Sequence, residues 1–346
     1  MKYFTINNAS SNMNKTIVLL GEYLLRLTPP HQQKIIQADH LEMHWAGSEA
    51  NIAVSLSILG EKCLYVTAMP GSELSRAGIS QLNKYGVQSE IISKNDSRVG
   101  IYYYESGNGA RPGRIIYDRN FSAFSSLAPG EIDWDKVFAG SDWFHWSGIT
   151  PALSANAVTV TKEALKKAKS KGLKISADFN YRSTLWNYGK DPSDIMPELL
   201  DYCDVVLADV NTAKLYFKIQ PDEDKLVEST FEMLKEKLKS VNSIAMTMRT
   251  QNANGNVYTG YFWNNGTVKK SKSYNLDHVT ERIGAGDAFM AGLIHSIREG
   301  VSEQDIVEFA TACGVMKHSL SGDFNIATKK EIISIMGQSG SGKIIR

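Results

Sequence analysis

The sequence predicts an α/β fold, in which a doubly wound, mostly parallel sheet is flanked by helices and carries a small β-sheet lid. Two observations lead to this prediction. Short apolar runs alternate with helical stretches almost to the end of the chain, as in right-handed βαβ units that place helices on both faces of a sheet. Two extended segments rich in Tyr, Arg and Pro interrupt the alternation, and we expect them to form the lid.

Six short apolar runs have the length and composition of buried parallel strands. They lie at residues 16–20, 63–66, 143–146, 174–177, 205–207 and 243–247. Helical stretches between them lie at residues 50–59, 74–85, 155–170 and 225–238. Two N-cap pairs predict further helices near the C-terminus, namely Ser302 with Asp305 and Thr328 with Glu331.

The two extended segments, 24–45 and 100–124, are too short and irregular for helices. We expect the lid, bounded at about 22–46 and 98–124, to lie over the carboxyl edge of the main sheet. Residues 258–263 and 267–271, joined by Asn264-Asn265-Gly266, predict a β-hairpin. We find no internal repeat and expect one domain over residues 1–346, with 337–346 as a flexible tail.

Three patterns are set aside. Residues 337–343 match the front of a Walker A loop, but Ile344 stands where a Ser or Thr is required, and no room remains for the following helix. His40 and His44 have an i, i+4 spacing without a third ligand nearby, so we expect no metal site there. The lysines of residues 162–174 lie on the polar side of a predicted helix and indicate a solvated face.

Composition excludes several classes of function. The chain has 346 residues, of which 42% are hydrophobic and 22% charged, as in ordinary globular proteins. A net charge of +1 argues against nucleic acid or a membrane surface as the main partner. Three cysteines without a CxxC pair fit reduced thiols. With no secretory signal and no apolar run near the ~20 residues of a membrane helix, we expect a cytoplasmic protein.

The clearest chemical signal is the turn Gly284-Ala285-Gly286-Asp287, which opens the apolar segment 288–297, a predicted buried helix. The N–H groups of the turn would lie at the helix N-terminus, where they favour an anion such as a transferring phosphoryl group. We expect Asp287 to take the proton from an attacking hydroxyl, while the amides of the turn stabilise charge. The alternative is a plain turn with an Asp near the N-cap.

This turn resembles the Gly-Ala-Gly-Asp signature of the ribokinase-like (PfkB) sugar kinases, and the resemblance extends from about residue 17 to residue 329. A second signature, Ala46-Gly47-Ser48-Glu49-Ala50-Asn51, stands earlier in the chain, in the family's order. The resemblance implies a ribokinase-like fold with a β lid. It also implies an enzyme that transfers a phosphoryl group from ATP, with Mg²⁺, to a hydroxyl of a small sugar.

Further segments resemble one subgroup, the 2-keto-3-deoxygluconate kinases (2-dehydro-3-deoxygluconokinases), namely residues 21–22, 25–30, 145–153, 178–182, 185–186 and 322–325. This resemblance implies a 6-phosphate product and a homo-oligomer. It implies a substrate pocket lined by Gly47, Asn51, Tyr102, Tyr117, Arg119 and Arg182. Residues near the nucleotide would be Thr247, Arg249, Gly284 and Gly286.

Two arginines independently favour an acidic sugar. Arg182 follows a predicted strand end at Asp178, where α/β sheets place ligand groups, and Arg119 lies in the predicted lid. A charge-assisted hydrogen bond to a carboxylate contributes about 1.5–3 kcal/mol, whereas a neutral sugar would leave the guanidinium groups without a partner. In the alternative interpretation, Arg182 pairs with Asp178, Arg119 is exposed, and the tyrosines Tyr102 and Tyr117 only pack within the lid.

The sequence departs from the family pattern at three positions. Ala46 replaces the first glycine of the usual pair, and Glu281 replaces an Asp, which would alter a monovalent-cation loop. In residues 209–212, Thr212 stands where many relatives have a Glu that supports magnesium through water. We therefore expect weaker magnesium binding, with the ion held mainly by ATP phosphates and water.

Three rival functions stay open. A kinase of the same family for a neutral sugar, fructose or ribose, would not need Arg182 for substrate binding. A kinase for the galactonate-derived epimer would use the same arginines. A non-catalytic sugar-acid sensor is favoured by the altered magnesium motif and disfavoured by the intact turn 284–287.

Overall fold

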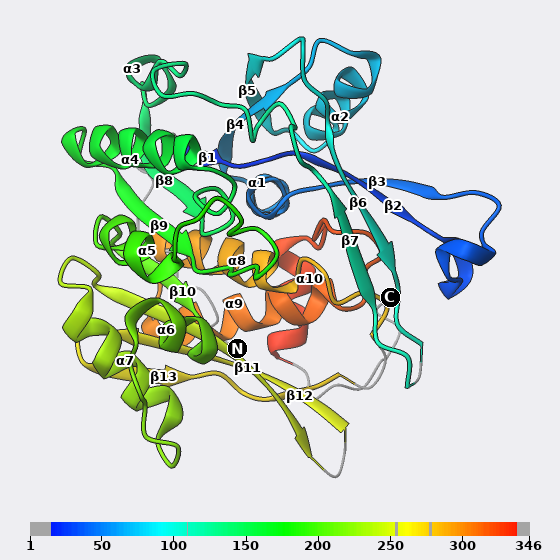
Figure 1. The fold of residues 1–346 in the computed structure, drawn as a ribbon. Coiled ribbons are helices and arrows are strands. Elements are labelled where there is room, and N and C mark those ends of the chain that lie inside the picture. The colour runs from blue at the N-terminus through cyan, green and yellow to red at the C-terminus, as the bar shows by residue number, and fades with distance from the viewer. Residues whose placement is uncertain (1–14, 109, 253–254, 277–278, 338–346) are drawn as a thin grey trace.

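The computed structural model describes residues 15–108, 110–252, 255–276 and 279–337. Its main sheet has the strand order β13-β12-β11-β10-β9-β8-β1-β4-β5, and β14 pairs with β12 (Figure 1). From β11 to β5 neighbouring strands are parallel, whereas β12 and β13 run antiparallel. The bounds are β1 (Thr16–Leu20), β4 (Lys62–Met69), β5 (Gln88–Ser93), β8 (Ser141–Ser147), β9 (Lys174–Asp178), β10 (Val205–Ala208), β11 (Ser243–Asn252), β12 (Gly255–Asn264), β13 (Thr267–Lys270) and β14 (Tyr274–Asn275).

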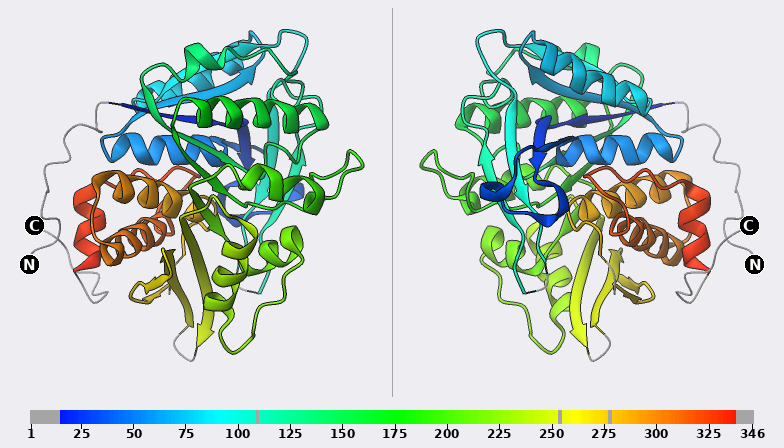
Figure 2. Two further views of the ribbon diagram at one scale, coloured as in Figure 1. Left: turned by 90° about the vertical axis from the view of Figure 1, so that its left-hand side faces the viewer. Right: turned by 90° about the vertical axis from the view of Figure 1, so that its right-hand side faces the viewer.

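Helices cover both faces of the main sheet (Figure 2). One face packs against α1 (Ser48–Ile58), α2 (Glu73–Lys84), α8 (Ala285–Glu299) and α9 (Glu303–Lys317). The other face packs against α4 (Ala155–Ser170), α5 (Pro192–Leu200), α6 (Val210–Phe217) and α7 (Leu226–Lys237). The short α3 (Trp134–Val137) lies beside α4, and α10 (Lys329–Met336) packs against α9.

Each face of the sheet has its own hydrophobic core, which explains the uninterrupted apolar runs in the sequence. In β10, Val205 packs into the core beneath α1 and α8, while its neighbour Val206 packs into the core beneath α4 to α7. Both side chains are fully buried. A strand buried on both faces needs apolar residues at consecutive positions rather than at alternate ones.

A second, smaller sheet forms from the two extended segments. We call it the lid sheet, and its strand order is β3-β2-β6-β7. Its strands are β2 (Leu24–Thr28), β3 (Glu42–Ala46), β6 (Gly100–Glu105) and β7 (Arg114–Asp118), with the short 3-10 helices η1 (Pro30–Gln32) and η2 (Ile35–Gln37) between β2 and β3. In Figure 1 these strands lie at the right of the main sheet. One face carries a small apolar cluster that includes Leu24, Ala46, Tyr102 and Tyr104.

The predicted strands and helices are present, with small shifts at their ends. The largest shift is in β11, which continues to Asn252. Both N-cap predictions are confirmed, because Ser302 accepts from the N–H of Asp305 and Thr328 forms a capping box with Glu331. The hairpin between β12 and β13 is confirmed too. Its central residues Asn265 and Gly266 have positive φ, as a tight two-residue hairpin turn requires.

The sequence interpretation missed the strands β5 and β14 and the helices α3, α5 and α6. Helix α6 starts two residues after β10, so no linker in the sequence separates the strand from the helix. The boundary is set by Asp209, whose carboxylate accepts the N–H of Thr212 at 2.9 Å. Helix α5 contains Pro197, which obscures its helical pattern.

Three predictions concern other features of the chain. The cysteines Cys63, Cys203 and Cys313 are buried and form no disulfide, as expected for reduced thiols. Within the described ranges, no helix has both the length and the apolar character needed to span a bilayer. Apart from Gly337, the Walker-like segment and the predicted tail lie outside the described residues.

Candidate active site

A cavity of about 460 Å³ lies between the lid sheet and the carboxyl edge of the main sheet. Strands β9 and β10 reach it with their C-terminal ends, and helices α1 and α8 reach it with their first turns. The lid sheet contributes Leu24, Ala46, Tyr102 and Tyr117. This is the edge at which open α/β sheets bind their ligands.

The cavity brings together nearly all of the residues predicted for the site. Its lining includes Gly47, Asn51, Tyr102, Tyr117, Arg119, Arg182, Thr247, Arg249, Gly284, Gly286 and Asp287. The exception is Ala285, which is fully buried in the first turn of α8 and is not part of the lining. Residues from both halves of the chain therefore meet at one place.

Asp287 is held between the first turns of two packed helices, α1 and α8. The Ser48 hydroxyl donates to its Oδ1 at 2.6 Å, and the Asn51 amide donates to its Oδ2 at 2.7 Å. Burial raises the pKa of Asp287, while these two hydrogen bonds and the nearby Arg182 act in the opposite direction. The two donors fix the orientation of the carboxylate without protonating it.

A third residue extends this arrangement. The side-chain amide of Asn180 donates to the Ser48 hydroxyl at 2.8 Å, so a chain of hydrogen bonds runs from Asn180 through Ser48 to Asp287. Asn180 has φ of 38°, in the left-handed region that Asn tolerates better than most residues. The sequence interpretation missed Ser48 and Asn180, although Ser48 lies inside the Gly47–Asn51 signature and Asn180 lies two residues after the end of β9.

Asn51 was expected to line the substrate pocket. It lines the cavity, and its amide nitrogen donates to Asp287, because α1 and α8 begin side by side. Its side-chain oxygen Oδ1 is buried and has no hydrogen-bond partner. A buried acceptor of this kind is costly to leave unpaired, so a hydroxyl donor in the cavity would satisfy it.

The predicted anion-binding turn has the expected geometry. Gly284 is the N-cap of α8 and has φ of 83°. A Cβ at this position would overlap the carbonyl oxygen of Asp323. Around Gly286 a Cβ would meet nothing within 4 Å, so this residue borders open space. No side chain caps α8, which leaves its first N–H groups for an anion.

The two predicted arginines have different environments. Arg119 is buried, and its guanidinium pairs with the buried carboxylate of Glu22, with 2.8 Å between Nε and Oε2. The alternative of an exposed Arg119 is therefore wrong, but its charge is already matched. Arg182 is exposed at the cavity and donates from Nη1 to the carbonyl oxygen of Tyr181 at 3.1 Å. Among the described side chains it makes no ion pair, and the alternative bridge to Asp178 is not formed.

The predicted tyrosines belong to the lid sheet. Tyr102 is buried and donates from its hydroxyl to Asp323 Oδ2 at 2.5 Å. Tyr117 pairs with it across β6 and β7 and lies beneath the Arg119 guanidinium, with 5.6 Å from Cζ to the ring centroid. Packing within the lid thus accounts for part of their role, and both still line the cavity.

Carboxylates other than Asp287 also border the cavity. Burial and the nearby Asp287 raise the pKa of Asp178 to about 8, although Arg182 and the Asn180 N–H lower it. Asp209 lines the cavity and caps α6, while Thr212 is buried one turn into that helix. In the part of the chain that the structure describes, no group of three His, Cys, Asp or Glu side chains could hold a metal ion by itself.

Comparison with known proteins assigns the fold to a family. A model described as pfkB family carbohydrate kinase matches residues 14–329. The chain belongs to the pfkB family of carbohydrate kinases. Its mostly parallel sheet with a second small sheet is the ribokinase-like fold, as the sequence resemblance implied.

Relatives match this carbohydrate kinase over nearly its whole length. A 2-dehydro-3-deoxygalactonokinase of Haloferax volcanii is 29% identical over 330 residues, which is 95% of this chain and 99% of that protein. The crystal structure of a 2-dehydro-3-deoxygluconokinase from Thermotoga maritima is 32% identical with a TM-score of 0.89, covering 94% of this chain and 99% of that one. A fructokinase from Xylella fastidiosa with bound ATP is 18% identical with a TM-score of 0.77, covering 93% and 98%, and shares the fold alone.

The two glycines of the turn should respond differently to a methyl group. Gly284→Ala forces a left-handed residue against the carbonyl oxygen of Asp323, so we expect a loss of about 1–3 kcal/mol in unfolding free energy and a loss of activity. Gly286→Ala is the matched control for stability, because its Cβ enters open space within a helix, where Ala is favoured over Gly. Denaturant unfolding and kinase assays of both variants check this, and equal stability losses would contradict it.

Proposed function

We propose that this carbohydrate kinase phosphorylates a 2-keto-3-deoxy sugar acid, with 2-keto-3-deoxygluconate as the first choice. The observation that carries the proposal is Arg182, an exposed guanidinium at the cavity that makes no ion pair among the described side chains. A substrate carboxylate would supply its missing partner. The names of the relatives from Haloferax volcanii and Thermotoga maritima support the same class of substrate.

Asp287 is the proposed general base. It would take the proton of the terminal hydroxyl, whose oxygen attacks the γ-phosphorus of ATP while the bond to the bridging oxygen of ADP breaks. The products are the sugar-acid 6-phosphate and ADP. The N–H groups of Gly284, Ala285, Gly286 and Asp287 would stabilise charge on the transferring group. Ser48 and Asn51 would hold the carboxylate toward the hydroxyl.

The sugar would lie among the residues of the lid and of α1. Gly47, Tyr102, Tyr117 and Arg119 border the cavity on that side, and the unpartnered Oδ1 of Asn51 would accept a sugar hydroxyl. The lid sheet covers the reacting groups, which would limit the access of water and hence wasteful hydrolysis of ATP.

ATP would lie along the carboxyl edge, near Thr247, Arg249 and the turn 284–286. Magnesium would arrive with the nucleotide and neutralise phosphate charge, held largely by phosphate oxygens and water. Asp178 and Asp209 are the cavity carboxylates that fit such a hydrated ion, since Thr212 offers no carboxylate. The proposed weak magnesium binding, cytoplasmic location and homo-oligomeric state remain predictions.

Asp287→Asn should abolish turnover while preserving substrate binding. Removing a positioned base lowers the rate by at least about 10²–10⁴-fold, and Asn keeps the shape of the side chain. We would measure ADP release with Mg·ATP against 2-keto-3-deoxygluconate, its galactonate epimer, gluconate, fructose and ribose. Asp135→Asn, at a surface ion pair that is not part of the cavity lining, is the control. A variant that turns over like the parent would remove Asp287 from catalysis.

The substrate panel also separates the rival functions. Turnover of fructose or ribose alone would keep the kinase and discard the sugar acid. Preference for the galactonate epimer would shift the assignment within the same acid class. Binding of a sugar acid without any turnover would favour the sensor.

Arg182→Gln should weaken the reaction with the sugar acid selectively. Losing one charge-assisted hydrogen bond lowers kcat/KM by about 10- to 150-fold, mostly through KM. Arg98→Gln is the matched control, because Arg98 pairs with Asp118 in the lid sheet and does not line the cavity. An unchanged KM for the acid in Arg182→Gln would show that this guanidinium does not bind the carboxylate.

Ser48→Ala should move the pH dependence of the enzyme. The Ser48 hydroxyl favours the charged form of Asp287, so its loss raises the pKa of Asp287 further. Since only the carboxylate accepts a proton, the acidic limb of kcat/KM should shift to higher pH by about 1–2 units. Ser57→Ala, on the same helix but bonded to the carbonyl of Tyr85, should leave the limb in place. A limb that stays fixed in both variants would contradict the role of Ser48.

A further inference from the structure

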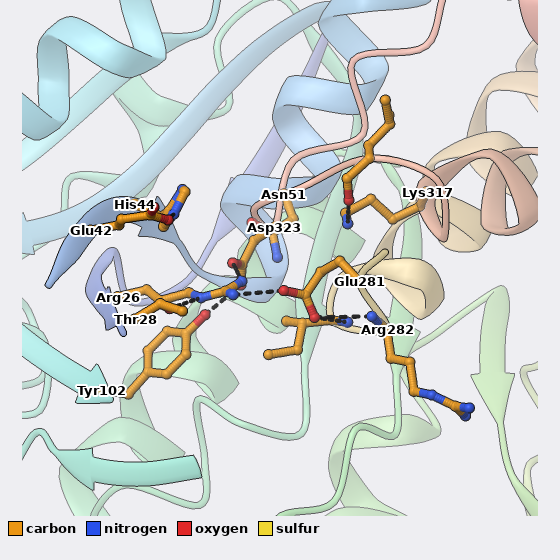
Figure 3. A network of polar contacts seen from close by, with 12 residues as sticks. Arg26, Thr28, Glu42, His44, Asn51, Tyr102, Glu281, Arg282, Lys317 and Asp323 are labelled. Carbon is orange, nitrogen blue, oxygen red and sulfur yellow. Dashed lines mark hydrogen bonds and ion pairs between the residues drawn. The ribbon is translucent and has the colours of Figure 1, made fainter. Parts of the chain in front are cut away.

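A buried guanidinium connects the lid sheet to the anion-binding turn. Arg26 in β2 is 2% exposed. It donates from Nη1 to Asp323 Oδ1 at 2.6 Å, from Nη2 to Glu281 Oε2 at 2.6 Å and from Nε to Thr28 Oγ1 at 2.8 Å (Figure 3). The ring of Tyr104 lies under the guanidinium, with 4.5 Å between Cζ and the ring centroid. All three guanidinium nitrogens are thus engaged within the protein.

Glu281 shapes the chain that leads into the turn. One of its carboxylate oxygens accepts from Arg26, and the other accepts the N–H groups of Arg282 at 2.9 Å and Ile283 at 3.3 Å. The next residue is Gly284, the N-cap of α8. Figure 3 shows the Arg282 side chain pointing away from this network, whereas the backbone N–H of Arg282 donates to Glu281.

Asp323 fixes the other side of the same turn. Its carbonyl oxygen lies so close to Gly284 that a Cβ there would overlap it. Its carboxylate accepts from Arg26 and from the hydroxyl of Tyr102 in β6. Two neighbouring strands of the lid sheet therefore contact the loop that packs against the turn.

Lys317 balances the charge of this cluster. It is fully buried and donates from Nζ to the carbonyl of Leu320 at 3.0 Å. Burial lowers the pKa of Lys317 to about 8, although Glu281 and Asp323 act to raise it. One guanidinium and one lysine thus face two buried carboxylates. Removing Arg26 alone would leave an excess of buried negative charge, which a matched second substitution must correct.

We propose that Arg26 is a positioning residue that couples the placement of the lid sheet to the geometry of the amides at residues 284–287. It does not touch the reacting groups; it acts through Glu281 and Asp323. The planar fork of an arginine can bridge two carboxylates at fixed angles, which a lysine cannot do. A small displacement of the amides weakens their interaction with the transferring phosphoryl group, so phosphoryl transfer is efficient only with the lid sheet in place. This inference rests on the proposed phosphoryl transfer.

The test compares Arg26→Met, Arg26→Lys and the double variant Arg26→Met with Glu281→Gln. The double variant restores the charge balance, leaves Asp323 with Lys317 and Tyr102, and keeps an acceptor for the N–H groups of Arg282 and Ile283. We expect kcat to fall about 10–100-fold in all three, with a smaller change in KM for sugar and ATP. The double variant should regain thermal stability relative to Arg26→Met without regaining kcat. Arg98→Met breaks another ion pair of the lid sheet away from the turn and should keep the parent's kcat.

A second measurement does not depend on turnover. Hydrogen exchange at the amides of Arg282, Ile283 and Ala288, which are hydrogen-bonded at the two ends of the turn, should be faster in the folded double variant than in the parent, and unchanged in Arg98→Met. Parent-like kcat together with parent-like exchange in the double variant would overturn the inference and reduce Arg26 to a structural ion pair. If the parent fails to turn over any sugar acid, the proposed substrate falls. The exchange result then decides alone whether Arg26 positions the turn.

Discussion

The arrangement of the cavity depends on the buried carboxylate of Asp287, placed where the first turns of α1 and α8 meet. A buried carboxylate needs hydrogen-bond donors, and the two donors come from Ser48 and Asn51 on the partner helix. The N-terminal signature and the C-terminal signature are therefore parts of one site. The parallel sheet beneath them fixes this meeting point, because it directs both helix N-termini to its carboxyl edge.

Charge pairing divides the arginines around the cavity into two groups. Arg26 and Arg119 are buried, and each is matched by carboxylates, Glu281 and Asp323 for the first and Glu22 for the second. Arg182, Arg249 and Arg282 are exposed at the cavity and make no such pair among the described residues. A buried charge without a partner carries a large desolvation penalty, whereas an exposed guanidinium is solvated by water until a ligand binds. The guanidinium groups that stabilise the lid sheet are thus matched within the protein, whereas the exposed guanidinium groups at the cavity have no carboxylate partner among the described residues.

The sequence predicted features that depend on neighbouring residues. Apolar runs revealed the strands because each is buried on two faces, and the small-residue turn before an apolar segment revealed the uncapped start of α8. It could not reveal pairs such as Arg26 with Glu281, which lie 255 residues apart and meet only in the fold. The environment of Arg119 was uncertain for the same reason, since burial depends on Glu22 across the lid. Helix α6 was missed because its boundary rests on one capping aspartate.

Three residues with positive φ lie at the points that bring groups to Asp287. Gly47, with φ of 151°, directly precedes Ser48; Asn180, with φ of 38°, donates to Ser48; Gly284, with φ of 83°, opens α8. Each is a conformation that most residues adopt at a cost, and such strain persists only where the surroundings impose it. Here those surroundings include the carbonyl oxygens of Glu22 and Asp323, each next to a glycine that no larger residue could replace without overlap. Both carbonyls belong to residues whose carboxylates pair with lid arginines. Glu22 and Asp323 therefore connect the lid sheet to the two glycines beside Asp287, so that the packing of the lid sheet bears on the geometry around this carboxylate.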